Sequence, residues 1–178
     1  MNRLDRPGLK LLIPRNEIRD RVAALGRRIT GDFAGRPLVV LGVLNGAFAF
    51  LADLGRELDL DCRIDFVALA SYGAGTSPRS AVRARLDAEV DVAGRDVLVV
   101  EDVVDTGGTL RFLRDRLAAR GARSVWFCVL LDKRDAPGDV DVDYVGFRVA
   151  SRFVVGYGLD LDGRYRCLPD LYTLEGNG

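Results

Sequence analysis

The chain of 178 residues contains no histidine. Without histidine a protein cannot build a Ser-His-Asp triad, and a zinc site loses its usual nitrogen ligand. Cysteine is scarce as well, because Cys62, Cys128 and Cys167 are odd in number and lack the spacing of a metal site. These absences argue against a zinc enzyme and against a histidine-dependent hydrolase. They favour reduced, buried cysteines in a cytoplasmic protein.

Net charge and long hydrophobic runs are missing too. Lys plus Arg and Asp plus Glu both number 26, so nothing draws the chain as a whole to nucleic acid or to a membrane surface. No apolar stretch approaches the length of a transmembrane helix, and residues 2–7 do not resemble a signal peptide. We expect no nucleic-acid partner and no membrane partner. The length and the 48% hydrophobic content suit one globular α/β domain.

The most informative stretch of the chain is Val97–Leu110. It begins with four apolar residues, Val97–Val100, which are typical of a strand buried on both faces of a parallel sheet. Two adjacent acids, Glu101 and Asp102, follow at the expected carboxyl end of that strand. After two valines comes a Gly-rich turn, and leucines at helical spacing follow it. The turn reads Asp105-Thr106-Gly107-Gly108-Thr109.

This order of strand, acids, turn and helix suits a phosphorylated ligand. A Gly-Gly turn lets backbone N–H groups approach an anion, and the start of the following helix favours negative charge. Thr106 and Thr109 would add hydroxyl donors. The two acids would suit the hydroxyls of an attached sugar, or a magnesium ion shared with it. The simpler alternative is a buried strand with a solvated acidic end and a helix cap. A Walker-type site is excluded, because no Gly-Lys-Ser/Thr sequence occurs.

The rest of the pattern alternates strands with helices. Apolar residues at helical spacing predict a helix over 16–29, with Asn16 as its N-cap and Gly31 as its stop, and a second helix over 47–58. A third helix is expected to end near Gly121. Strands are expected over 38–43, 63–70, 96–101 and 124–131. This order predicts right-handed crossovers and a central parallel sheet with helices on both faces.

The last third of the chain is rich in strand patterns and poor in helix patterns. Its expected strands lie at 144–149, 153–157 and 171–174, and we interpret this region as a small hood packed against the main sheet. We expect a single domain over 1–178, with a core of about 36–150 and a hood from the N-terminal residues and about 151–178. A long interval that opens with Ser71 and Tyr72 separates two core strands, and residues 81–87 are expected to form a hairpin arm within it.

At Glu101 to Thr109 the sequence resembles the phosphoribosyl pyrophosphate motif of the type I phosphoribosyltransferases. Four more segments extend the likeness to the hypoxanthine-guanine branch of this family. They are Val43-Leu44-Asn45-Gly46-Ala47-Phe48, Leu130-Leu131-Asp132-Lys133-Arg134, the hood sequence from Phe153 to Asp160, and Tyr165-Arg166-Cys167-Leu168-Pro169. The resemblance covers nearly the whole chain. It implies a phosphoribosyltransferase that makes IMP or GMP and pyrophosphate in purine salvage.

The resemblance also implies roles for individual residues. Asp105 would be catalytic, and Ser71 and Tyr72 would begin a mobile loop that closes over the substrates. The phosphoribosyl pyrophosphate site would contain Glu101, Asp102, Asp105, Thr106, Gly107, Gly108, Thr109, Leu44, Asn45, Gly46 and Arg166. The purine site would contain Lys133, Phe153, Val154 and Asp160. Mg²⁺ would be held by Glu101, Asp102 and Asp160. The partners would be phosphoribosyl pyrophosphate, a 6-oxopurine base and pyrophosphate, in a homodimer or homotetramer.

The chemistry of Lys133 fits its implied role. A 6-oxo group accepts a hydrogen bond, and an ammonium only donates, so Lys133 would favour 6-oxopurines over adenine. The less favoured alternative is that Lys133 is simply a charge at a strand end. Phe153 could equally be a core residue.

Asn45 stands where many relatives carry lysine, and in this family the peptide before this position can be cis. The preference among hypoxanthine, guanine and xanthine stays open at this point. So does the alternative of an inactive regulator that keeps the fold and the phosphoribosyl site.

Overall fold

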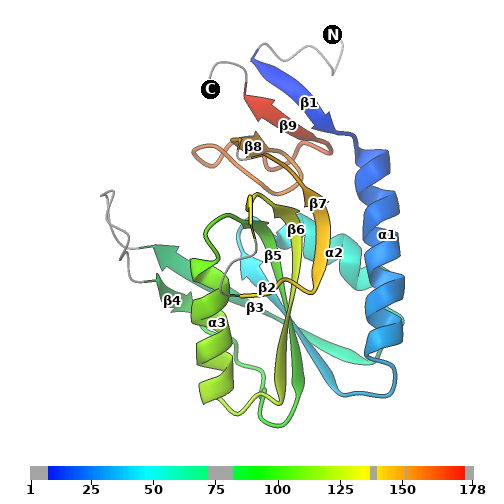
Figure 1. Ribbon diagram of the computed structural model, residues 1–178, viewed down its shortest axis with the longest axis vertical. Coiled ribbons are helices and arrows are strands. Elements are labelled where there is room, and N and C mark those ends of the chain that lie inside the picture. The colour runs from blue at the N-terminus through cyan, green and yellow to red at the C-terminus, as the bar shows by residue number, and fades with distance from the viewer. Residues whose placement is uncertain (1–7, 72–81, 137–139, 151, 175–178) are drawn as a thin grey trace.

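The computed structural model describes residues 8–71, 82–136, 140–150 and 152–174. Its main sheet has six strands in the order β4-β3-β2-β5-β6-β7 (Figure 1). The neighbouring pairs among β3, β2, β5, β6 and β7 are parallel, and β4 is antiparallel to β3. The strands are β2 (Leu38–Leu44), β3 (Cys62–Ser71), β4 (Val82–Leu86), β5 (Asp96–Val104), β6 (Ser124–Asp132) and β7 (Tyr144–Arg148).

Helices cover the two faces of this sheet, as expected. Alternate residues of one strand enter two different cores, because successive side chains of a strand point to opposite faces. Val40 packs with α1 (Arg15–Asp32) and α2 (Phe48–Glu57), whereas Val39 and Leu41 pack with α3 (Gly108–Ala119). The fully apolar runs in β2 and β5 are therefore those of strands buried on both faces. The predicted parallel α/β sheet is confirmed.

A second, three-stranded sheet lies beyond the carboxyl ends of β5 and β6. Its order is β1-β9-β8, from β1 (Leu9–Ile13), β9 (Leu171–Leu174) and β8 (Val154–Val155), and both pairings are antiparallel. Figure 1 shows this sheet above the main sheet, with the first and last described strands side by side. The N-terminal and C-terminal segments thus meet over one edge of the core.

Several expectations about the helices and strands were wrong. The strand at 144–149, expected in the hood, pairs in parallel with β6 and is the last strand of the main sheet. Strand β5 continues past its expected end at Glu101 as far as Val104, because Val103 pairs with Leu131 and Val104 with Asp132. Helix α1 begins at Arg15 rather than after Asn16, since the carboxylate of Asp170 accepts the first helical N–H at 2.8 Å.

Helix α1 also passes through Gly31, which was expected to stop it. It ends at Asp32, and the C-cap residue Phe33 donates its N–H to the carbonyl of Ile29 at 3.0 Å. The hairpin arm at 81–87 is confirmed by β4, which pairs with the end of β3. Ser71 is the last residue of β3, and Tyr72 lies outside the described residues. Within the described part of the chain, every helix is too short or too polar to span a membrane.

Candidate functional site

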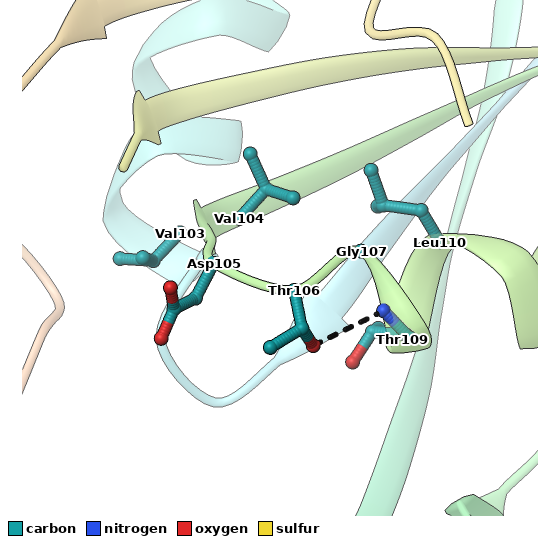
Figure 2. A pocket seen from close by; sticks show the side chains of 8 residues that line it. Val103, Val104, Asp105, Thr106, Gly107, Thr109 and Leu110 are labelled. Atoms are coloured by element: carbon teal, nitrogen blue, oxygen red, sulfur yellow. Dashed lines mark hydrogen bonds between the residues drawn. The ribbon is translucent and has the colours of Figure 1, made fainter. Parts of the chain in front are cut away.

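The turn between β5 and α3 forms a small cavity. The cavity measures about 140 Å³ and is lined by Val103, Val104, Asp105, Thr106, Gly107, Gly108, Thr109 and Leu110 (Figure 2). Gly107 occupies the N-cap position of α3 at φ +78°, a left-handed conformation that glycine adopts without strain. The backbone N–H of Gly108 lies 3.5 Å from the hydroxyl oxygen of Thr106. The first helical N–H groups therefore face an open, polar turn, which is a suitable site for an anion.

Figure 2 also shows the side chains of this turn. The hydroxyl oxygens of Thr106 and Thr109 lie on the side of the turn where α3 begins, and the carboxylate of Asp105 lies at the opposite end, next to β5. Asp105 is exposed to solvent. A phosphate on the turn would thus be separated from the carboxylate, and the like charges would not be forced into contact.

The two acids of β5 lie in a far more buried setting. The side chain of Glu101 is 7% exposed, and its Oε2 atom has no hydrogen-bond partner among the described residues. Burial raises the pKa of Glu101 well above its ordinary value, and the neighbouring carboxyl of Asp102 raises it further. Burial also raises the pKa of Asp102, although Glu101, backbone N–H groups and Arg166 oppose that rise. A bound cation, or a hydroxyl group that donates a hydrogen bond, would offset the negative charge of this buried pair.

The loop that follows β2 reaches the same acids. The Leu44–Asn45 peptide bond is cis, as the family resemblance allowed. Gly46 lies so close to Asp102 that an added Cβ would overlap the Oδ2 atom of that carboxylate. On its other side, a Cβ on Gly158 would overlap the carbonyl oxygen of Gly46. The loop after β2, the acids of β5 and the hood therefore meet at Gly46.

Lys133 follows the end of β6 and faces the acids of β5. Its backbone N–H donates to the carbonyl of Val104 at 2.9 Å, which continues the pairing of the two strands. Partial burial lowers the pKa of the Lys133 ammonium, and the carboxylates of Asp105 and Asp102 counteract this effect. The preceding Asp132 is already paired, because Arg134 donates to both of its oxygens at 2.9 and 3.0 Å. Of the two cations at this strand end, Lys133 is therefore the one that is not paired with Asp132 and that acts on Asp105 and Asp102.

Four predicted residues come from the hood. The ring of Phe153 is 44% exposed, whereas Val154 is buried in β8. Asp160 already has partners for both oxygens, since Oδ1 pairs with Arg166 at 2.7 Å and Oδ2 accepts the N–H of Gly163 at 2.7 Å. Arg166 also donates to the carbonyl of Gly158 at 2.7 Å. Arg166 is thus bonded both to Asp160 and to the turn that contacts Gly46.

One of the three residues expected to hold a metal is already ion-paired. Within the described residues, no group of three or more acidic, histidine or cysteine side chains is arranged to hold a metal ion. Glu101 and Asp102 are adjacent on β5, but Asp160 is paired with Arg166 in the hood. Sequence reasoning missed this ion pair, and it also missed the contact between Gly158 and Gly46. The Gly-Tyr-Gly sequence of the hood gave a hint of a tight turn, but not of what the turn would touch.

A second, larger cavity lies at the opposite edge of the sheet, where the strands begin. It measures about 480 Å³, and its lining includes Arg36, Arg63 and Arg95. None of the predicted site residues lines it. The predicted residues of the main sheet and its loops lie instead at the carboxyl edge of the sheet, where open α/β sheets bind their ligands.

Comparison with known proteins agrees with this geometry. The family model for the phosphoribosyl transferase domain matches residues 14–162. The chain belongs to the phosphoribosyltransferase family. The matched segment includes the turn after β5, the loop after β2 and Lys133.

Individual members of the phosphoribosyltransferase family match over nearly their whole length. The hypoxanthine phosphoribosyltransferase of Salmonella typhimurium is 43% identical, over 90% of this chain and 92% of that protein. The hypoxanthine-guanine phosphoribosyltransferase of Mycobacterium avium is 45% identical, over 93% of this chain and 85% of that protein. A crystal structure of a Staphylococcus aureus hypoxanthine phosphoribosyltransferase superposes with a TM-score of 0.90 at 36% identity, and covers 94% of this chain and 92% of its own.

Proposed function

We propose that this protein transfers the 5-phosphoribosyl group from phosphoribosyl pyrophosphate to N9 of hypoxanthine, guanine or both. The products would be IMP or GMP and pyrophosphate, so the protein would serve purine salvage. One observation carries the proposal: the Gly-rich turn, the buried acid pair and Lys133 lie together at the carboxyl edge of one sheet. The names of its relatives support the same reaction.

The phosphoribosyl group would bind across the end of β5. Its 5-phosphate would lie on residues 105–109 and accept hydrogen bonds from the first N–H groups of α3 and from Thr106 and Thr109. Glu101 and Asp102 would accept hydrogen bonds from the ribose hydroxyls. The unpartnered Oε2 of Glu101 supports this assignment, because a buried carboxylate oxygen without a donor is costly. Arg166 and the Leu44–Gly46 loop would contact the pyrophosphate.

Mg²⁺ fits the same acid pair. When bound, the ion would offset the negative charge that develops on the leaving pyrophosphate. Glu101 and Asp102 would hold it, through the ribose hydroxyls or directly, and the cation would offset the buried negative charge that raises the pKa of both acids. Asp160 would join them only by giving up its ion pair with Arg166.

The base would lie between the hood and the end of β6. Lys133 would donate to the 6-oxo group, and the exposed ring of Phe153 would stack on the purine, an interaction worth on the order of 1–3 kcal/mol. Backbone groups near Val154, with Asp160, would contact the far edge of the base. As pyrophosphate leaves, C1 of the ribose becomes cationic, N9 attacks its opposite face, and Asp105 would take or share the proton on N7. The loop that begins with Ser71 and Tyr72 would close over the substrates and exclude water.

Three further predictions accompany this function. The chain would form a single domain, with a core of about 36–150 and a hood built from the N-terminal residues and about 151–178. It would assemble as a homodimer or homotetramer, which light scattering would measure. It would reside in the cytoplasm. No observation favours the alternative of an inactive regulator, since Asp105 and Lys133 are both present and lie at the same site.

The test is a turnover assay with Mg²⁺, phosphoribosyl pyrophosphate and four bases given separately. Hypoxanthine, guanine or both should yield nucleotide, and adenine should not, because its 6-amino group cannot accept from Lys133. Turnover of xanthine would show whether the site accepts an oxo group at C2. Turnover of adenine alone would refute the role of Lys133. Binding of phosphoribosyl pyrophosphate without turnover of any base would favour the regulator instead.

A further inference from the structure

A tight turn of the hood is pressed against the Leu44–Gly46 loop. Three consecutive residues of this turn have left-handed backbones, with φ of +99° at Gly156, +48° at Tyr157 and +101° at Gly158. Gly156 and Leu159 exchange two backbone hydrogen bonds of 3.1 and 3.0 Å across the turn. Gly158 cannot carry a side chain, because a Cβ would overlap the carbonyl oxygen of Gly46. The turn and the loop are thus in backbone contact.

The side chain of Tyr157 fastens this turn to the core. The residue is 8% exposed, and its hydroxyl donates to the Oδ2 atom of Asp53 at 2.8 Å. Burial and this hydrogen bond both raise the pKa of the Tyr157 phenol, so it remains a donor throughout the working range of pH. Asp53 belongs to α2, the helix that begins directly after the Leu44–Gly46 loop. The bond therefore joins the hood to the element that ends the loop.

The same turn also supports Arg166. Two backbone bonds hold it to the segment that carries this arginine, from Tyr157 N–H to the carbonyl of Leu168 at 2.7 Å and from Gly158 N–H to that of Arg166 at 3.0 Å. The guanidinium of Arg166 in turn donates a hydrogen bond to the carbonyl of Gly158 at 2.7 Å. If the turn moved, Arg166 and Gly46 would separate, since both are positioned through Gly158.

We propose that Tyr157, through its hydrogen bond to Asp53, is a positioning residue for the pyrophosphate end of phosphoribosyl pyrophosphate. It holds the Gly156–Leu159 turn against the Leu44–Gly46 loop and so sets the distance between Arg166 and Gly46. The role rests on the function proposed above. Tyr157 itself need not contact the substrate, because it acts through the two groups that would bind pyrophosphate.

Tyr157→Phe tests this role, since phenylalanine keeps the ring and removes only the hydroxyl. The KM and the calorimetric Kd for phosphoribosyl pyrophosphate should rise about tenfold, the loss expected for one hydrogen bond to a charged acceptor. The KM for the purine should change less than threefold. Asp53→Ala should have the same effect, and the double variant should be no worse than either single one. Asp53→Asn keeps an acceptor oxygen and should recover much of the loss.

Tyr144→Phe is the matched control. The hydroxyl of Tyr144 donates to Asp32 at the same distance, 2.8 Å, but it joins β7 to α1 instead of the hood to α2. This variant should lose comparable stability and keep its affinity for phosphoribosyl pyrophosphate. Equal loss of affinity in both variants, or unchanged affinity in Tyr157→Phe, would overturn the proposal. Failure of the wild-type protein to form nucleotide would instead refute the proposed function, and the calorimetric Kd would still test the positioning role.

Discussion

Gly46 is the position where a single methyl group should do most damage to the site. In Gly46→Ala the new Cβ would overlap the carboxylate of Asp102, whose short side chain has little room to yield. The carboxylate would have to rotate away and give up the N–H of Val103, which it now accepts at 2.8 Å. Losing a hydrogen bond to a charged group costs about 1.5–3 kcal/mol. If the ribose and the metal need Asp102 in place, kcat/KM for phosphoribosyl pyrophosphate should fall roughly 10- to 150-fold.

Gly31→Ala provides the matched control for this substitution. Gly31 is exposed in α1, and an added Cβ there would meet no atom within 4 Å. Alanine is the better helix former by about 0.8–1.0 kcal/mol, so this variant should be slightly more stable and equally active. Initial-rate kinetics and urea denaturation of both variants would separate an effect on the site from an effect on folding. Full activity in Gly46→Ala would refute the argument that Asp102 must lie against Gly46.

Three more predictions follow from the site and the sheet. Asp105→Asn should lower kcat far more than it weakens binding of phosphoribosyl pyrophosphate, and equal losses in single-turnover and binding experiments would contradict the proton transfer. Lys133→Gln should lower kcat/KM for hypoxanthine about 10- to 150-fold, and it should reduce the enzyme's preference for hypoxanthine over adenine, because an amide both donates and accepts hydrogen bonds. An unchanged ratio of the two kcat/KM values in competition assays would show that Lys133 does not select the base. The hydrogen bond from Arg123, with Ser124 and Arg36, lowers the pKa of Asp96 from 3.8 to about 2, so its stabilisation is complete above pH 4 and lost as the pH falls toward 2. Asp96→Asn should therefore flatten the acid limb of the stability curve between pH 4 and 2, and an unaltered limb in denaturant titrations would show that other carboxylates set it.

Sequence reasoning succeeded where the signal is local or periodic. Runs such as Leu38–Leu44 are apolar at every position, which is typical of a strand covered on both faces, and their alternation with helix patterns indicated the parallel sheet. The turn after β5 was readable because its residue types act through their own backbone: Gly107 adopts the left-handed conformation that the N-cap of α3 requires. The hairpin arm expected at residues 81–87 is present as β4, which pairs with β3.

The failures lie where a distant partner decides the outcome. The start of α1 depends on the carboxylate of Asp170, at the other end of the chain, and no local rule reveals that cap. The strand at Tyr144–Arg148 has the same residue pattern whether it joins the hood or the main sheet. Only its pairing with β6 shows that it belongs to the main sheet. The ion pair between Asp160 and Arg166 likewise cannot be seen in the sequence.

The glycines of the site show how a local signal can be read correctly and still miss its function. Gly158 has a positive φ, so a turn requires glycine there, but Gly46 does not have one. What forbids a side chain at Gly46 is the Asp102 carboxylate on one side, and the Gly158 backbone lies against its carbonyl on the other. Neither glycine could carry a side chain, because the loop after β2, the acids of β5 and the hood approach one another closely there. Since that approach also brings the acid pair, the loop and Arg166 together, packing between the hood and the core should govern substrate affinity as strongly as the residues that touch the substrate.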